Sequence, residues 1–116
     1  MTETLTPGRA LYDRQIQFLL DKDADGLIET NYAPDAELIS FQNVIKGSDA
    51  LKTYFRGYIE MLGDLVIEST DKFAEADDAV FFEATVSSAL GRVRVYDAWR
   101  LRDGKITHHF TGVMGA

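Results

Sequence analysis

The chain has 116 residues, of which 46% are hydrophobic and 27% charged, as is typical of one soluble globular domain over residues 1–116. Nineteen acidic residues against twelve Lys and Arg give a formal net charge of −7, which argues against nucleic acid or anionic membrane as a partner. The lack of cysteine excludes disulfides, thiolate metal sites and cysteine nucleophiles. With no long apolar stretch and no signal-peptide pattern, we expect a cytoplasmic protein without membrane contact.

Three helices are predicted in the first half of the chain, over about residues 7–21, 25–32 and 48–62. The first begins with Thr6, which suits the N-cap, and Pro7, which suits the first helical position. The second ends before Pro34, because the residue that precedes a proline avoids the helical region. The third has Ser48 as its expected N-cap and one apolar face, and Gly63 ends it.

Strands are predicted over residues 36–41, 44–45, 65–76, 79–89, 92–102 and 105–114. The turns between the last four are expected at residues 77–78, 90–91 and 103–104. Asp103-Gly104 is the strongest hairpin signal, because glycine tolerates the positive φ of a primed turn. Helices followed by an antiparallel meander indicate an α+β fold, in which helices on one face of a curved sheet would leave a pocket.

The two turns that join the last three predicted strands fix their register. Counting from these turns pairs Val86 with Val95, Ala84 with Asp97, Phe82 with Trp99, Trp99 with His108, and Asp97 with Phe110. One face then gathers mostly apolar side chains and is expected to face the core: Phe82, Ala84, Val86, Val93, Val95, Asp97, Trp99, Leu101, Ile106, His108 and Phe110. The opposite face carries arginines, acids, threonines and His109, and suits solvent or a polar dimer contact.

Asp97 and His108 are the polar residues on the expected apolar face, where they would be diagonal neighbours. An apolar wall disfavours the charged form of a carboxyl group, and a perturbed acid in a pocket is a candidate for acid–base catalysis. The structural alternative is a buried pair that locks the sheet, or an Asp97 hydrogen-bonded to a side chain such as Tyr12. A slip of one residue in the last hairpin would turn His109 inward in place of His108.

Three segments carry a resemblance to a known family: Asp23–Leu38, with its Tyr-Ala-Pro-Asp-Ala stretch, Ile45–Leu51, and Tyr96–Ile106. In their order and spacing they resemble the NTF2-like superfamily, in its SnoaL-like and ketosteroid-isomerase-like branch. The resemblance implies a cone-shaped, cystatin-like α+β fold, with three N-terminal helices on a curved, mostly antiparallel sheet that encloses an apolar pocket. It also implies a homodimer packed through the outer face of the sheet.

Ketosteroid isomerases use an Asp as general base, and a Tyr and a protonated Asp as oxyanion hole. By resemblance, Asp97 matches the protonated Asp, and Tyr12 lies one turn before the expected Tyr near Gln15 or Ile16. The base would lie near Ser40, and serine cannot act as a carboxylate base. Ketosteroid isomerase activity as such is therefore not expected.

The sequence leaves open whether the protein is an enzyme. One hypothesis is cofactor-independent acid–base chemistry on a small hydrophobic metabolite, as in an isomerase, cyclase, dehydratase or hydrolase, with Asp97 and His108 as the catalytic residues. The alternative is a non-catalytic ligand-binding or dimeric association domain of the same fold. In either case the expected pocket residues are Tyr12, Trp99, Phe110, Tyr54, Tyr58 and Ser40.

Residues 21–29 resemble the start of a calcium-binding EF-hand loop, with Asp at its first, third and fifth positions and Gly at its sixth. The twelfth position is Tyr32, where a bidentate Glu is needed. We therefore interpret these acids as a solvated turn that caps the next helix. No metal and no cofactor are expected.

Overall fold

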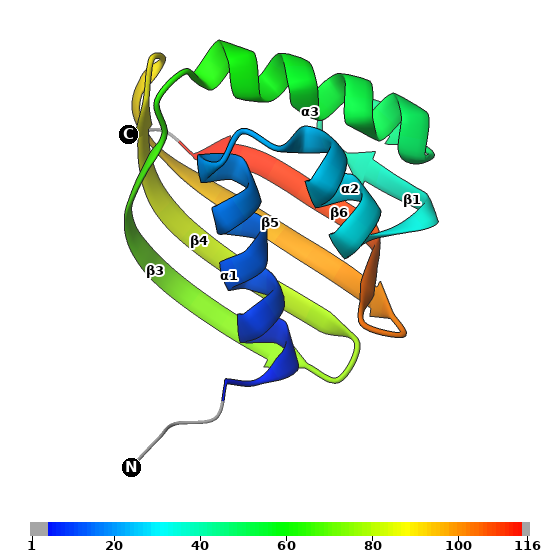
Figure 1. The fold of residues 1–116 in the computed structure, drawn as a ribbon. Coiled ribbons are helices and arrows are strands. Elements are labelled where there is room, and N and C mark those ends of the chain that lie inside the picture. The colour runs from blue at the N-terminus through cyan, green and yellow to red at the C-terminus, as the bar shows by residue number, and fades with distance from the viewer. Residues whose placement is uncertain (1–4, 115–116) are drawn as a thin grey trace.

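Three helices and a six-stranded sheet make up residues 5–114, the part of the chain that the computed structural model describes (Figure 1). In chain order they are α1 (Pro7–Leu20), α2 (Ala24–Asn31), β1 (Tyr32–Ile39), β2 (Val44–Lys46), α3 (Ser48–Leu62), β3 (Val66–Ala76), β4 (Ala79–Ser88), β5 (Gly91–Arg102) and β6 (Lys105–Met114). Every predicted helix and strand is present, so the predicted α+β order is confirmed.

The sheet has the strand order β2-β1-β6-β5-β4-β3 and is antiparallel except where β1 runs parallel to β6. The long strands β3 to β6 curve strongly, and the three helices lie on their concave side (Figure 1). A curved sheet covered on one face in this way buries apolar side chains between the two layers. The largest fully buried side chains gather there: Trp99, Tyr12, Leu11, Leu27, Ile28, Leu38, Leu51 and Ile106.

The N-terminus of α1 is fixed to β3 by a carboxylate. Thr6 caps the helix as predicted, because its side chain accepts a hydrogen bond from the backbone N–H of Arg9. Glu75 on β3 accepts from the backbone N–H of Gly8 at 2.9 Å and from the hydroxyl of Thr6 at 2.5 Å. A negative charge at this end also complements the helix dipole, so the contact stabilises both the helix and its position on the sheet.

Two of the differences from the predicted boundaries have a clear backbone cause. The N-cap of α3 is Gly47, with φ 91°, so Ser48 is the first helical residue and not the cap. β1 starts at Tyr32, four residues earlier than expected, and contains Pro34. The strand tolerates this proline because the β1–β6 register shifts between Tyr32 and Glu37, where a backbone N–H is not needed for the ladder.

The β4–β5 turn lies one residue earlier than predicted. Ser88 pairs with Gly91, so the turn is formed by residues 89–90, and Gly91, with φ 104°, begins β5. Asp97 therefore lies opposite Phe82 instead of Ala84. Because this moves the register by two residues, each side chain keeps its predicted face.

The β5–β6 hairpin has the predicted Asp103-Gly104 turn but also contains a β-bulge that the prediction lacks. Ile106 lies opposite Leu101 and His108 opposite Arg100, so Thr107 is an extra residue in β6. The Thr107 hydroxyl donates to the carbonyl of Arg100 at 3.1 Å. The extra residue reverses every later side chain of β6, which turns His109 inward and His108 outward.

None of the helices in residues 5–114 is long and apolar enough to cross a membrane.

Candidate functional site

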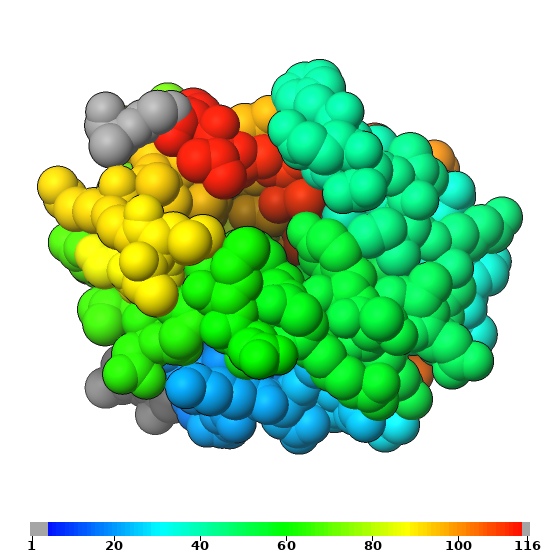
Figure 2. Space-filling view, turned by 90° about the horizontal axis from the view of Figure 1, so that it is seen from above, coloured from blue at the N-terminus to red at the C-terminus, as the bar shows by residue number. Residues whose placement is uncertain are grey.

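A cavity of about 640 Å³ lies between the concave face of the sheet and helices α1 and α3. From above, the surface is hollowed between the β1–β2 turn, α3 and the end of β6 (Figure 2). Six of the eight predicted site residues line it: Tyr12, Ser40, Tyr54, Tyr58, Asp97 and Trp99. Most of the other lining side chains are aliphatic or aromatic, as in sites that bind small molecules.

His108 and Phe110 do not line the cavity, so the prediction that they face it is wrong. The bulge at Thr107 places both on the convex face of the sheet. The His108 ring lies there with Nε2 at 3.4 Å from a carboxylate oxygen of Glu37. Phe110 is 45% exposed.

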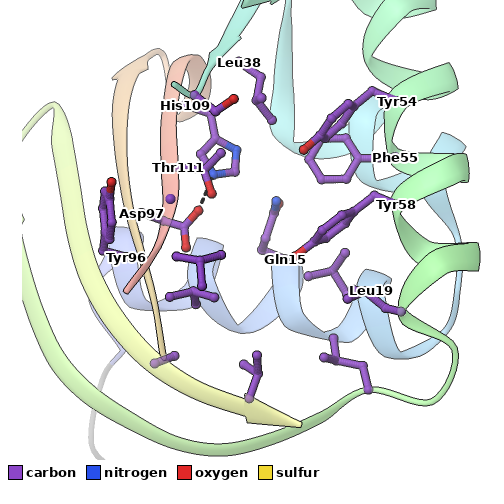
Figure 3. A pocket seen from close by; sticks show the side chains of 18 of the residues that line it. Gln15, Leu19, Leu38, Tyr54, Phe55, Tyr58, Tyr96, Asp97, His109 and Thr111 are labelled. Atoms are coloured by element: carbon purple, nitrogen blue, oxygen red, sulfur yellow. Dashed lines mark hydrogen bonds and ion pairs between the residues drawn. The ribbon is translucent and has the colours of Figure 1, made fainter. Parts of the chain in front are cut away.

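Asp97 and His109 form a hydrogen-bonded pair on the sheet wall of the cavity (Figure 3). His109 Nε2 lies 2.7 Å from Asp97 Oδ1, and the two residues are only 5% and 8% exposed. The bulge brings them together, because it places His109 opposite Trp99, diagonal to Asp97. The alternative register, with His109 inward, is therefore the one that the structure has.

A buried chain of hydrogen bonds continues from His109 along the cavity wall, which Gln15 also lines, to Asn31. His109 Nδ1 lies 2.7 Å from the Tyr32 hydroxyl oxygen, which also accepts from Nε2 of Gln15 at 2.9 Å. Gln15 Oε1 in turn accepts from Nδ2 of Asn31 at 3.0 Å. Sequence reasoning missed Gln15 and Asn31 as parts of the site. A signal for Gln15 was present, since it follows Leu11 and Tyr12 at helical spacing on the buried face of α1.

Helix α3 contributes two phenols to the opposite wall, where the side chains of Tyr54 and Tyr58 reach into the cavity (Figure 3). Their rings stack with an interplanar angle of 9° and centroids 6.0 Å apart. Burial, helped by the nearby charge of Asp97, raises the pKa of Tyr58 to about 12 and raises that of Tyr54 in the same direction. Both phenols therefore stay neutral near pH 7 and can donate hydrogen bonds.

Tyr12 and Ser40 line the cavity with their polar groups already engaged. The Tyr12 hydroxyl shares a hydrogen bond of 2.7 Å with the Thr70 hydroxyl. Ser40 Oγ accepts from the backbone N–H groups of Gln42 and Asn43, which holds the β1–β2 turn. Both hydrogen bonds therefore hold the shape of the cavity wall.

Asp97 is the one acidic side chain among the described residues that line the cavity, and none of them is Lys or Arg. The arrangement therefore offers one carboxylate, one imidazole and four phenols, those of Tyr12, Tyr54, Tyr58 and Tyr96, in a largely apolar enclosure. A positioned carboxylate and imidazole can exchange protons with a bound molecule, and phenols can stabilise oxygen that becomes negative.

The acidic turn near residue 23 serves helix α2 and an ion pair. Asp23 accepts from the backbone N–H of Gly26 at 2.9 Å and is the N-cap of α2, as the capping interpretation predicts. Asp25 forms an ion pair of 2.6 Å with Arg56 of α3. Within residues 5–114, no cluster of three or more His, Asp or Glu side chains is arranged to hold a metal ion.

Solved structures with the same fold are similar to this chain only at low sequence identity. An NTF2-like protein from Anabaena variabilis ATCC 29413 matches with TM-score 0.79 and 18% identity, over 100% of this chain and 96% of that one. TerC, co-crystallized with polyporic acid, matches with TM-score 0.77 and 19% identity, over 94% and 92%. An NTF-2 like protein of unknown function from Burkholderia xenovorans LB400 matches with TM-score 0.78 and 15% identity, over 95% and 84%. Such identities show a shared fold and leave the activity to be argued from the site.

No curated protein sequence matches the chain. The model of the SnoaL-like domain family matches residues 12–109, which is most of the chain and includes α2, α3, five complete strands and His109 of the site. This match shows that the chain belongs to the SnoaL-like domain family, and its six-stranded curved sheet with three helices is the fold that it shares with NTF2-like proteins.

Proposed function

We propose that the cavity binds a small, mostly apolar and uncharged metabolite, and that Asp97 and His109 perform cofactor-independent acid–base chemistry on it. The reaction class is that of an isomerase, cyclase, dehydratase or hydrolase. The observation that carries the proposal is the 2.7 Å pair of Asp97 and His109 on the wall of a largely apolar cavity.

The charges around the cavity support an uncharged ligand. The described lining residues offer no Lys or Arg to bind an anion, and Asp97 would repel one. A volume of about 640 Å³ is in the range of cavities that hold ligands of a few rings. TerC, which shares the fold, was co-crystallized with polyporic acid, a small organic molecule.

Asp97 is the proton acceptor in this proposal. Its Oδ1 takes the hydrogen bond from His109, and no described residue forms a side-chain hydrogen bond with Oδ2. Oδ2 would remove a proton from carbon next to a carbonyl group, and the electron pair of the broken C–H bond would move onto the carbonyl oxygen. The phenols of Tyr54 and Tyr58 face the sheet wall from α3 and would donate to that oxygen (Figure 3).

Hydrogen–deuterium exchange of a model ketone tests this chemistry without knowledge of the natural substrate. The uncharged two-ring ketone 2-tetralone is incubated with the protein in D₂O, and loss of its α-hydrogens is followed by proton NMR. We expect exchange faster than in buffer, and a decrease of about 100-fold or more in this acceleration for Asp97→Asn, since a positioned base contributes about 10²–10⁴-fold.

The matched control is Asp71→Asn, because Asp71 lies outside the cavity, hydrogen-bonded to Ser69 and Thr85. This variant should exchange 2-tetralone like the wild-type protein. Equal acceleration by Asp97→Asn would contradict the catalytic role of Asp97.

The alternative function is binding without turnover, and Ser40 favours it. The carboxylate base of related isomerases is replaced there by a serine whose oxygen is used to hold a turn. In that case 2-tetralone would bind, as measured by calorimetry, while its α-hydrogens exchanged no faster than in buffer.

A second copy of the chain is the partner that we propose for the convex face of the sheet. One row of side chains crosses all six strands there and is entirely apolar: Ala74, Phe81, Ala98, Phe110, Ile39 and Val44. Phe81 and Phe110 are about half exposed, and charges of both signs flank the row at Arg100, Glu37 and Glu83. Replacing Phe110 with Glu should halve the mass measured by light scattering, and a monomeric wild-type protein would contradict the proposal.

A further inference from the structure

The hydrogen-bond chain that includes Gln15, His109 and Asp97 of the cavity wall runs from the protein surface to Asp97. It begins at Arg14, an exposed residue of α1 whose Nε donates to Oδ1 of Asn31 at 3.4 Å. It then passes through Asn31, Gln15, Tyr32 and His109, which are between 0% and 5% exposed, and it ends on Asp97. The chain thus connects α1, α2, β1, β6 and β5.

Arg14 determines the direction of this chain, because a guanidinium can only donate hydrogen bonds. The amide oxygen of Asn31 must face Arg14, so the amide nitrogen of Asn31 donates to Gln15. Gln15 then uses its oxygen to accept and its nitrogen to donate to the Tyr32 hydroxyl oxygen.

The same direction continues to the imidazole. The buried Tyr32 O–H also needs an acceptor. Its two partners among the described residues are Nε2 of Gln15, which can only donate, and Nδ1 of His109, so the O–H donates to Nδ1. Nδ1 must then carry no proton, and the proton of the neutral ring lies on Nε2, which donates to Asp97 Oδ1. Every donor therefore points toward Asp97.

We propose that this directional chain, set by Arg14, holds His109 as the neutral Nε2–H tautomer and so keeps Asp97 as an unprotonated hydrogen-bond acceptor. Asn31 and Tyr32 are then positioning residues that act on the cavity through His109, and Gln15, which also lines the cavity, positions His109 through Tyr32. The inference deepens the proposed function, because it makes Asp97 the base and not the protonated oxyanion-hole acid that the resemblance to ketosteroid isomerases implies.

Substitutions that turn an amide into an acceptor-only carboxylate should reverse the chain. In Asn31→Asp the new carboxylate accepts hydrogen bonds from both Arg14 and Gln15. The Gln15 amide must rotate to donate to it, so the amide oxygen of Gln15 then faces Tyr32. The Tyr32 O–H donates to that oxygen, so its own oxygen must accept a hydrogen bond from Nδ1 of His109. Gln15→Glu has the same consequence one step closer to the imidazole, and both substitutions preserve side-chain shape.

The tautomer is measured directly by two-dimensional ¹H–¹⁵N NMR of the histidine rings in the full chain at pH 8. His108 is assigned with His108→Gln, which removes a half-exposed ring outside the cavity. We expect wild-type His109 to show an unprotonated Nδ1 and a protonated Nε2. Both carboxylate variants should show a protonated Nδ1 on His109 in most molecules.

The matched control is Thr30→Asp, which adds the same charge at an exposed position beside Asn31 but outside the chain. It should leave His109 in the wild-type tautomer, which separates the hydrogen-bond direction from a general effect of charge. The inference is overturned if wild-type His109 carries its proton on Nδ1, or if the carboxylate variants that fold keep the wild-type tautomer. The NMR result needs no ligand, so it fails or succeeds independently of the 2-tetralone experiment.

Discussion

The two faces of the same strands hold their carboxylates in opposite ways. On the convex side and the outer edge of the sheet, Glu68 pairs with Arg92 at 3.1 Å and Asp71 with Arg94 at 3.3 Å. On the concave side one carboxylate, Asp97, is held by a single imidazole at 2.7 Å.

The contrast shows that a carboxylate's surroundings, and not its residue type, decide what it can do. Hydrogen bonds from Thr85 and Ser69 lower the pKa of Asp71 below its usual range and give each of its oxygens a side-chain donor. Asp97 retains an oxygen without a side-chain partner among the described residues, next to a cavity whose described lining includes no Lys or Arg. A solvated carboxylate helps to keep the protein soluble, whereas an enclosed one can meet a ligand.

The largest expected difference between the two faces concerns packing. Trp99→Ala removes a side chain that is 1% exposed and should lower the free energy of unfolding by about 3–5 kcal/mol. Phe110→Ala, on the convex face, should cost less than about 1 kcal/mol in the monomer, because that ring is half exposed. Urea denaturation of both variants, at protein concentrations below the dissociation constant of the proposed dimer, measures the two losses of stability. Equal losses would refute the ranking.

The two adjacent histidines give the next largest difference. His109→Phe leaves the Asp97 carboxylate without its donor and should lower the free energy of unfolding by about 1–3 kcal/mol. His108→Phe should change it by less than about 0.5 kcal/mol, since its ion pair with Glu37 is half exposed. In the double variant His109→Phe, Asp97→Leu, part of the loss should return, because no unpaired carboxylate is left.

The smallest effect should appear only in alkaline solution. Burial raises the pKa of Tyr58 to about 12, so the folded protein keeps that proton where the unfolded chain, with an ordinary value near 10, has lost it. Stability from this group is complete below pH 10 and decreases as the pH rises toward 12, by at most about 1 kcal/mol per pH unit. Tyr58→Phe should show a shallower decrease in urea titrations at pH 9 to 11.

The helices and strands were predictable because their signals are local. Thr6 and Pro7 mark the start of α1, the apolar stripe of α3 repeats at helical spacing, and Asp103-Gly104 forms the expected turn. The family resemblance, drawn from three short segments, is confirmed by the match over residues 12–109. Asp97 and Trp99 line the cavity as expected because alternation along a strand survives a register shift of two.

That His109 faces the cavity in place of His108 was not predictable from the turn alone. An ideal ladder from the Asp103-Gly104 turn would place His108 opposite Trp99, and only the extra residue at Thr107 moves His109 there. A threonine in a strand does not by itself indicate a bulge, since it is also a common strand residue. The partners of Gln15 and Asn31 depend on how α1 and α2 pack over β1, which is a long-range property.

Trp99 is the one tryptophan of the chain, and it lies on the cavity wall against the His109 ring, with ring centroids 5.9 Å apart and planes nearly perpendicular. Its fluorescence therefore comes from a single known position that a ligand or a change of imidazole charge must affect. The protein carries its own optical reporter in the site, so ligand libraries can be screened on the unlabelled wild-type chain.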